Sequence, residues 1–178
     1  AFDNITALQV PAGASDSLTG RDATANWTLN LAGGTYLDSA RTLSFSGFDS
    51  FQGGAGIDAF QVNANRTANI LGGDLGDSVT IGAGVTLTGV VTLEDGDDSV
   101  SLANGSVITG VVSGGDGTDE LSHAATSTTV AVSISAATTG VTGFDGTTTG
   151  LTSGFTGIDT FTGGTSGTDT FTSDVAAA

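Results

Sequence analysis

The feature that most constrains the fold of this chain is a glycine- and aspartate-rich turn that recurs about every twenty residues from residue 53 onward. Each copy precedes a short apolar run and ends in an aspartate, at Asp58, Asp77, Asp98 and Asp119, with separations of 19, 21 and 21 residues. A fixed period of this length is typical of solenoid proteins, in which each repeat forms one coil. Glycine permits the positive φ of a tight turn and aspartate supplies oxygen ligands, so the same spacing also points to stacked calcium sites.

Two adjacent units of 21 residues show what one coil contains. Residues 78–98 read SVTIGAGVTLTGVVTLEDGDD, and residues 99–119 read SVSLANGSVITGVVSGGDGTD. Apolar and polar residues alternate over 78–81, 85–88 and 90–93, which indicates three short strands separated by turns. Three strands and three corners per coil predict an all-β fold, a right-handed parallel β-helix (β-solenoid) with 19–21 residues per coil.

In such a fold the inward residues of successive coils stack in ladders. We expect the stacked pairs Val79 on Val100, Ile81 on Leu102, Leu87 on Ile108, and Val91 on Val112. The shorter unit at 59–77 is expected to continue the same ladders with Phe60, Val62, Ile70 and Leu71. One coil buries little by itself, so the core becomes continuous only when coils stack.

The whole chain, residues 1–178, is interpreted as a single solenoid domain, because its length suffices for one domain with a core. Residues 1–42 would form irregular N-terminal coils and 43–122 the regular coils with Gly-Asp turns. Residues 123–178 would form an irregular coil followed by a second partial repeat, because the sequence at 156–171 resembles that at 46–60.

Charge and composition exclude several classes of partner. The chain has 19 acidic residues against three arginines and no lysine, a formal net charge of −16. Nucleic acids and anionic membranes require clustered cations, so neither is an expected partner, and no apolar segment suggests membrane insertion. Cysteine and methionine are absent while Gly, Thr, Ser, Ala and Asp abound, which is typical of a bacterial exported or surface protein.

Two nonapeptides carry a family resemblance. Residues 53–61 (GGAGIDAFQ) and 114–122 (GGDGTDELS) match the pattern G-G-x-G-x-D-x-(apolar)-x at every position. The chain thus resembles repeat regions of large bacterial surface adhesins of the filamentous-haemagglutinin-like and RTX-like type. The resemblance implies a calcium-binding β-solenoid in an extracellular protein. Here one nonapeptide occurs per coil, rather than several in direct succession, so a single row of ions along one edge is expected.

The candidate calcium ligands lie in these turns. They are the closing aspartates Asp58, Asp77, Asp98 and Asp119, the aspartates at the variable turn position Asp74, Asp95 and Asp116, and the additional Asp97. Carboxylates stacked at the strand spacing of about 4.8 Å would repel one another unless a cation neutralised them. The alternative is that Asp-Gly corners only form stable turns, in which aspartate accepts hydrogen bonds from the local backbone.

The remaining distinctive side chains give no signal for catalysis. His123 is the sole histidine, without a cysteine or second histidine for a zinc site, and we expect it at the surface or at a coil edge. Trp27 and Tyr36 are expected to form a hydrophobic cap on the first coil, with a sugar-stacking surface as the alternative.

These observations favour a non-enzymatic, extracellular structural or adhesive segment of a bacterial surface or biofilm-matrix filament protein, stiffened by calcium along one edge. The expected partners are further copies of the chain or neighbouring repeats of a longer chain, with surface glycans as additional candidates. The alternative is a β-helix enzyme acting on polysaccharides, or an accessory module of one.

Overall fold

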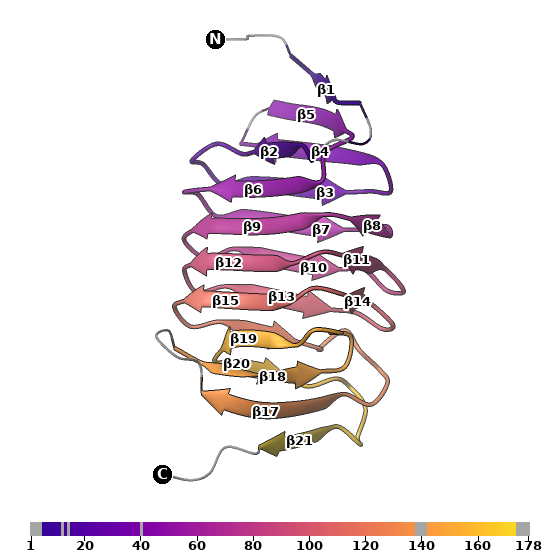
Figure 1. The fold of residues 1–178 in the computed structure, drawn as a ribbon, viewed down its shortest axis with the longest axis vertical. Helices are drawn as coiled ribbons and strands as arrows, with labels where there is room; N and C mark the ends of the chain where they lie inside the picture. The colour runs from indigo at the N-terminus through magenta and orange to yellow at the C-terminus, as the bar shows by residue number, and fades with distance from the viewer. Residues whose placement is uncertain (1–4, 12, 14, 40, 138–141, 174–178) are drawn as a thin grey trace.

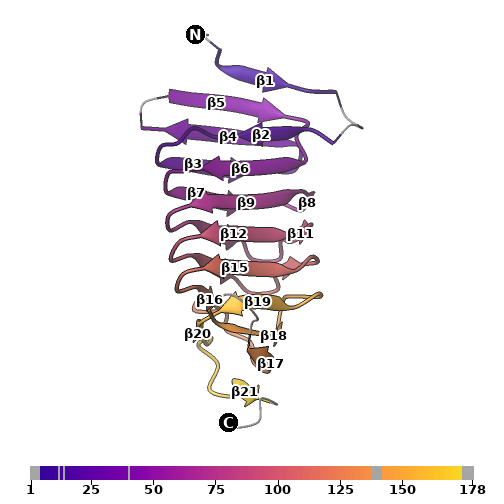
Figure 2. The ribbon, with the colours of Figure 1, turned by 60° about the vertical axis from the view of Figure 1, so that its left-hand side comes forward.

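The computed structural model is a rod of stacked β-strands, with β1 and β21 at its opposite ends (Figure 1). It describes residues 5–11, 13, 15–39, 41–137 and 142–173. The layers follow one another along a single long axis when the rod is turned (Figure 2). Within the described ranges, no helix has the length and apolar character needed to span a membrane.

Three sheets form the sides of the rod. Sheet A has the spatial order β1 (Ala7–Gln9), β5 (Arg41–Ser46), β4 (Gly33–Asp38), β3 (Ala25–Leu29), β7 (Asp58–Val62), β10 (Ser78–Ile81), β13 (Ser99–Leu102), β16 (Glu120–Ser122), β20 (Thr160–Thr162). Sheet B has the order β2 (Ser17–Thr19), β6 (Ser50–Gly54), β9 (Asn69–Asp74), β12 (Val91–Asp95), β15 (Val112–Asp116), β19 (Phe155–Ile158), β18 (Phe144–Thr148), β17 (Ala131–Ala137), β21 (Thr170–Ser173). The short sheet C contains β8 (Arg66–Thr67), β11 (Thr86–Thr88) and β14 (Val107–Ile108).

The middle of the rod is the parallel β-helix predicted from the repeat. Each coil contributes one strand to each sheet, as in the successive sets β7–β8–β9, β10–β11–β12 and β13–β14–β15. The segments expected at 78–81, 85–88 and 90–93 correspond to β10, β11 and β12. Neighbouring strands in these coils pair in parallel, which is the geometry that a fixed repeat length produces.

The predicted inward ladders are confirmed. Val79 pairs with Val100, Ile81 with Leu102, Leu87 with Ile108, and Val91 with Val112, and all eight side chains are buried. Phe60, Val62 and Ile70 extend the ladders as expected. The prediction for Leu71 is wrong, because successive strand residues point to opposite faces and its neighbour Ile70 takes the inward position.

One strand near each end of the rod runs against the others. In sheet A, β4 is antiparallel to both β3 and β5, and in sheet B, β18 is antiparallel to both β17 and β19. The outer strands β1 and β21 then pair in parallel with β5 and β17. The direction of the central coils is therefore restored at both ends.

The similar segments 46–60 and 156–171 occupy different places in the rod. The first contains β6 in sheet B and then enters β7 in sheet A. The second contains β20 in sheet A and leads to β21 in sheet B. The same turn motif therefore serves two different corners of the solenoid.

Candidate functional site: a buried aspartate ladder

The four closing aspartates of the repeat are inside the rod. Asp58, Asp77, Asp98 and Asp119 are 0–2% exposed and lie where the chain enters successive strands of sheet A. Each precedes an inward apolar residue by two positions, as Asp77 precedes Val79. Side chains two apart in a strand share a face, so the strand that buries the valine also buries the carboxylate.

Hydrogen bonds join these carboxylates from coil to coil. The Oδ1 atom of Asp77 accepts from the backbone N–H of Asp58 at 2.8 Å, and Oδ1 of Asp98 accepts from N–H of Asp77 at 2.6 Å. Asp119 receives the N–H of Asp98 at 3.0 Å, and Asp159 Oδ2 receives the N–H of Asp119 at 3.0 Å. We call these five residues the aspartate ladder.

The second oxygen of each buried carboxylate has a different environment. The Oδ2 atoms of Asp58, Asp77, Asp98 and Asp119 are buried and make no hydrogen bond within the described part of the chain. A Cβ atom added to Gly72 would lie 2.4 Å from Oδ2 of Asp77, and one on Gly114 would lie 2.3 Å from Oδ2 of Asp119. These two glycines therefore leave the space that the carboxylates occupy.

Burial raises the pKa values of these carboxyl groups. Desolvation raises the pKa of Asp58 and Asp119 to about 6 and that of Asp77 and Asp98 to about 7, against the opposing effect of the hydrogen bonds they accept. For Asp77 and Asp98, neighbouring carboxylates in the ladder raise the pKa further. Protonation at Oδ2 can thus relieve the repulsion within the stack near neutral pH.

The other predicted ligands lie outside. Asp74, Asp95 and Asp116 are exposed and stand in register on sheet B, and exposed Asp97 accepts the N–H of Thr118 at 2.9 Å. The eight predicted ligands therefore divide into a buried column and an exposed set.

This division bears on how an ion could be held. Across the described ranges, no group of three or more Asp, Glu or His side chains is placed to hold one metal ion. Carboxylate oxygens are suitable calcium ligands, but here an ion would need backbone carbonyls or water to complete its shell. Calcium binding stays a prediction.

The prediction that His123 lies at the surface or a coil edge is wrong. Its side chain is only 2% exposed, and its Nε2 lies 3.0 Å from the hydroxyl oxygen of Thr148. Burial lowers the pKa of its imidazole. The repeat itself indicates an inward position for this residue. Residue 123 follows Leu102 by 21 positions and therefore continues the inward ladder of Ile81 and Leu102.

Trp27 and Tyr36 form the expected hydrophobic cap. Trp27 is 1% exposed and stacks on Phe60 with ring centroids 5.3 Å apart, while Tyr36 meets the indole edge-on at 4.5 Å. Because both rings are buried in the core, they form no sugar-stacking surface. The indole Nε1 also donates to Oδ1 of Asp58 at 2.9 Å, which supplies the donor that a preceding coil would provide.

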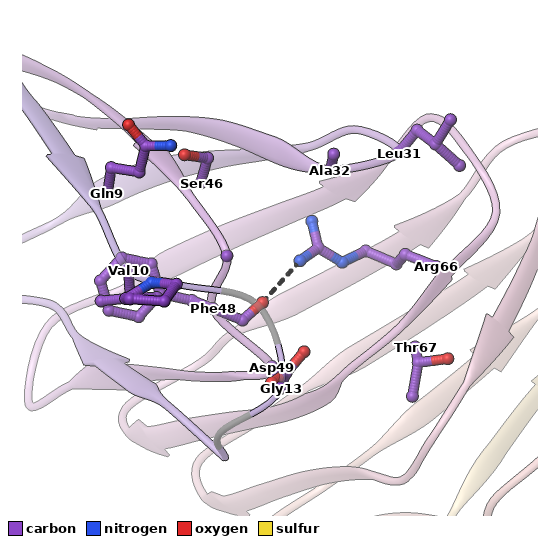
Figure 3. Close-up of a pocket in the computed structure, with 12 residues that line it drawn as sticks. Gln9, Val10, Gly13, Leu31, Ala32, Ser46, Phe48, Asp49, Arg66 and Thr67 are labelled. Carbon is purple, nitrogen blue, oxygen red and sulfur yellow. Dashed lines mark hydrogen bonds between the residues drawn. The ribbon is translucent and has the colours of Figure 1, made fainter.

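Arg66 has a structural role that no motif in the sequence indicates. It stands in register with Leu87 and points inward at the N-terminal end of sheet C. Its guanidinium donates to the carbonyl oxygens of Asn30 at 3.0 Å, Gly33 at 3.2 Å and Phe48 at 3.0 Å, and it lies over the Phe51 ring at 4.7 Å. Figure 3 shows it reaching toward Phe48 beside a surface pocket. Arg66 thus covers the core at the N-terminal edge of sheet C, where β8 is the first strand.

Comparisons with protein-family models, with curated proteins and with solved structures find no match for this chain. The fold and the aspartate ladder together define its class as a parallel β-helix.

Proposed function

We propose that this chain is a non-enzymatic structural or adhesive segment of an extracellular bacterial filament or surface protein. The observation that carries the proposal is the aspartate ladder, which links successive coils by hydrogen bonds along the axis of the rod. Buried hydrogen bonds of this kind resist separation of the coils, because each broken bond leaves a polar group unsatisfied. A rod with its first and last strands at opposite ends suits a spacer that bears load.

The contacts of the buried titratable groups support a structural role over an enzymatic one. Asp77 and Asp98 each accept a backbone N–H of the preceding coil with one carboxylate oxygen. The ring of His123 faces a threonine hydroxyl. Glycoside hydrolysis needs two carboxyl groups that face a substrate from opposite sides of a cleft. The ladder carboxylates are instead stacked inside the rod, where they cannot face a substrate in this way. The polysaccharide-active enzyme is therefore the second candidate, after the structural role.

Calcium along one edge is the part of the proposal that comes from the sequence. In this structure the exposed carboxylates suited to it are Asp74, Asp95 and Asp116, with Asp97 nearby. These side chains supply the hard oxygen ligands that calcium prefers. Binding there would neutralise part of the charge along the outer edge and stiffen the corner.

Shape and activity measurements test the proposal together. Small-angle scattering and electron microscopy of the purified chain are expected to show a rod at neutral pH, and incubation with acidic and neutral polysaccharides is expected to release no product. Cleavage that disappears in a carboxylate-to-amide variant of the chain would replace the structural role with the enzymatic one. Binding to immobilised surface glycans without cleavage would specify the adhesive role.

A further inference from the structure

The strands at the two ends of the rod have the same direction as the central coils. In sheet A these edge strands are β1 and β20, and in sheet B they are β2 and β21. β4 and β18 are each antiparallel to the strands on both sides, so the strands beyond them again run in the direction of the central coils. An edge strand presents unpaired backbone N–H and C=O groups, so each end of the rod can accept another parallel strand.

The inward ladders also reach both ends of the rod and finish there in apolar residues. In sheet A the ladder begins at Leu8, which pairs with Phe45, and ends at Phe161, which pairs with Leu121. In sheet B it begins at Leu18, which pairs with Phe51. At the other end of sheet B, Phe171 pairs with Val132 and is 62% exposed.

Each end of the core is hollowed. At the N-terminal end a cavity of about 600 Å³ has an apolar part, formed by Ile5, Leu8, Leu43 and Tyr36, and a polar part, formed by Arg21, Asp38, Arg41 and Thr42. At the C-terminal end a smaller one of about 170 Å³ is lined partly by Phe161 and Phe171, whose ring centroids are 6.3 Å apart. Large apolar residues at exposed ends mark an interaction surface.

The two ends differ in charge. All three arginines lie within residues 1–66, which also contain six acidic residues, whereas residues 123–178 contain four acidic residues and neither arginine nor lysine. Arg41 is exposed on β5, next to the edge strand β1. Contact between unlike ends therefore brings Arg41 to an end whose charged residues are all acidic, whereas contact between two C-terminal ends places only acidic residues together.

We propose that copies of this chain associate head to tail, with β20 of one copy pairing in parallel with β1 of the next and β21 pairing with β2. In this register Phe161 stacks on Leu8 of the next copy, and Phe171 stacks on its Leu18. The ladders of both sheets then continue through the contact. This contact is heterologous and open, so it produces a filament rather than a closed dimer. The inference deepens the proposed structural function by naming its partner and its interface.

The first experiment removes one apolar contact at the C-terminal end. Phe171→Asp is compared with the wild-type chain and with Ile57→Asp, a matched control on the side of the rod where Ile57 is 50% exposed. Sedimentation velocity over a range of concentrations is expected to show association of the wild type. We expect Phe171→Asp to weaken it about tenfold or more and Ile57→Asp to leave it unchanged. Equal weakening by both variants, or a wild type that is monomeric throughout, would overturn the proposal.

A crosslinking experiment tests the direction and register with Phe171 intact. The chain has no cysteine, and Ala7 on β1 and Thr160 on β20 are exposed residues that become direct partners in the proposed contact. Parallel strands about 4.8 Å apart bring paired Cα atoms within disulfide range. Oxidation of the double variant Ala7→Cys, Thr160→Cys is expected to give a ladder of covalent multimers, whereas each single variant gives none beyond a dimer. A double variant that forms no more multimer than the single variants would exclude this register.

The two proposals fail separately. Scattering from the monomeric rod and the polysaccharide assay test the structural role, and neither depends on association. A chain that is rod-shaped and inactive, but monomeric and free of crosslinks, retains the structural role and loses the head-to-tail contact.

Discussion

The indole Nε1 of Trp27 donates a hydrogen bond of 2.9 Å to Oδ1 of Asp58, and this contact begins the aspartate ladder. In the next three coils the Oδ1 atom receives a backbone N–H instead, as Asp77 receives that of Asp58. Trp27 lies on β3, which pairs with β7 although β4, β5 and β6 come between the two strands in the sequence. A side chain from an irregular coil therefore completes a regular array.

Removing the indole donor should destabilise the fold. Trp27→Phe keeps an aromatic ring over Phe60 but leaves Oδ1 of Asp58 buried without a donor, and we expect a loss of about 1–3 kcal/mol in the free energy of unfolding. Urea unfolding followed by circular dichroism measures it. The comparison is Tyr36→Phe, which removes only the hydroxyl that accepts the N–H of Arg21 and should cost less. Equal unfolding midpoints for Trp27→Phe and wild type would show that the indole hydrogen bond contributes nothing.

The protein should be more stable at mildly acidic pH than at pH 8. The pKa values of Asp77 and Asp98 are raised from the ordinary value of 3.8 to about 7 in the folded state, so folding favours the protonated carboxyl groups. The resulting stability is fully present below pH 3.8 and is lost as the pH rises through about 7. We expect the melting temperature to fall by about 5 °C or more between pH 5 and pH 8.

A charge-matched pair of variants isolates the ladder in that measurement. Asp98→Asn keeps an Oδ1 acceptor for the N–H of Asp77 but cannot ionise, so it should reduce the pH dependence. Asp74→Asn removes the same charge from an exposed position and should leave the dependence as it is. If both substitutions flatten the curve equally, net charge rather than the ladder controls the response.

Glycine at position 94 should stabilise the chain. Glu94 has a φ of +76°, whereas its register partners Gly73 and Gly115 are glycines with φ values of +120° and +115°. A side chain in this region costs about 1–2 kcal/mol, so Glu94→Gly is expected to raise the free energy of unfolding by about 1 kcal/mol. Thr92→Gly, two residues away within β12, should lower it by about 0.5–1 kcal/mol. A lower melting temperature for Glu94→Gly would contradict the argument.

Replacing the guanidinium of Arg66 should open the N-terminal end of sheet C. Arg66→Met retains an unbranched side chain but leaves the carbonyls of Asn30, Gly33 and Phe48 without their donor, for an expected loss of about 2–4 kcal/mol. Hydrogen exchange should increase first in the loops around residues 30–33 and 47–49. Unchanged exchange there would mean that Arg66 does not hold these loops.

The calcium prediction can be tested by thermal melting. A ligand that binds only the folded state stabilises it, by about 2.7 kcal/mol at one hundred times its dissociation constant. Millimolar calcium is therefore expected to raise the melting temperature and a chelator to reverse the rise, with sodium chloride of equal ionic strength as the control. The double variant Asp95→Asn, Asp97→Asn should respond less. An unchanged melting temperature in calcium would end the prediction.

Much of the central fold follows from the repeat. Residues 21 positions apart, such as Val79 and Val100, occupy equivalent places because every coil advances the chain by one strand spacing. The same rule carries Leu102 to His123, and applying it there would have predicted the buried histidine. The two-residue step from Asp77 to Val79 likewise places this carboxylate inside, because alternate residues of a strand share a face.

The sequence by itself determined the solenoid, its three-sided coil and the ladders of the regular region, because those contacts repeat at a fixed separation along the chain. Only the tertiary structure decided how the ladder begins and how the ends are built. The contact of Trp27 with Asp58 depends on the antiparallel strand β4 and its neighbours, which have no period. Arg66 became a cap because the loops at Asn30 and Phe48 meet it where a further coil is missing. The glycine-aspartate turn placed both sets of carboxylates at one corner, and burial against the neighbouring coil separated the ladder from the exposed aspartates.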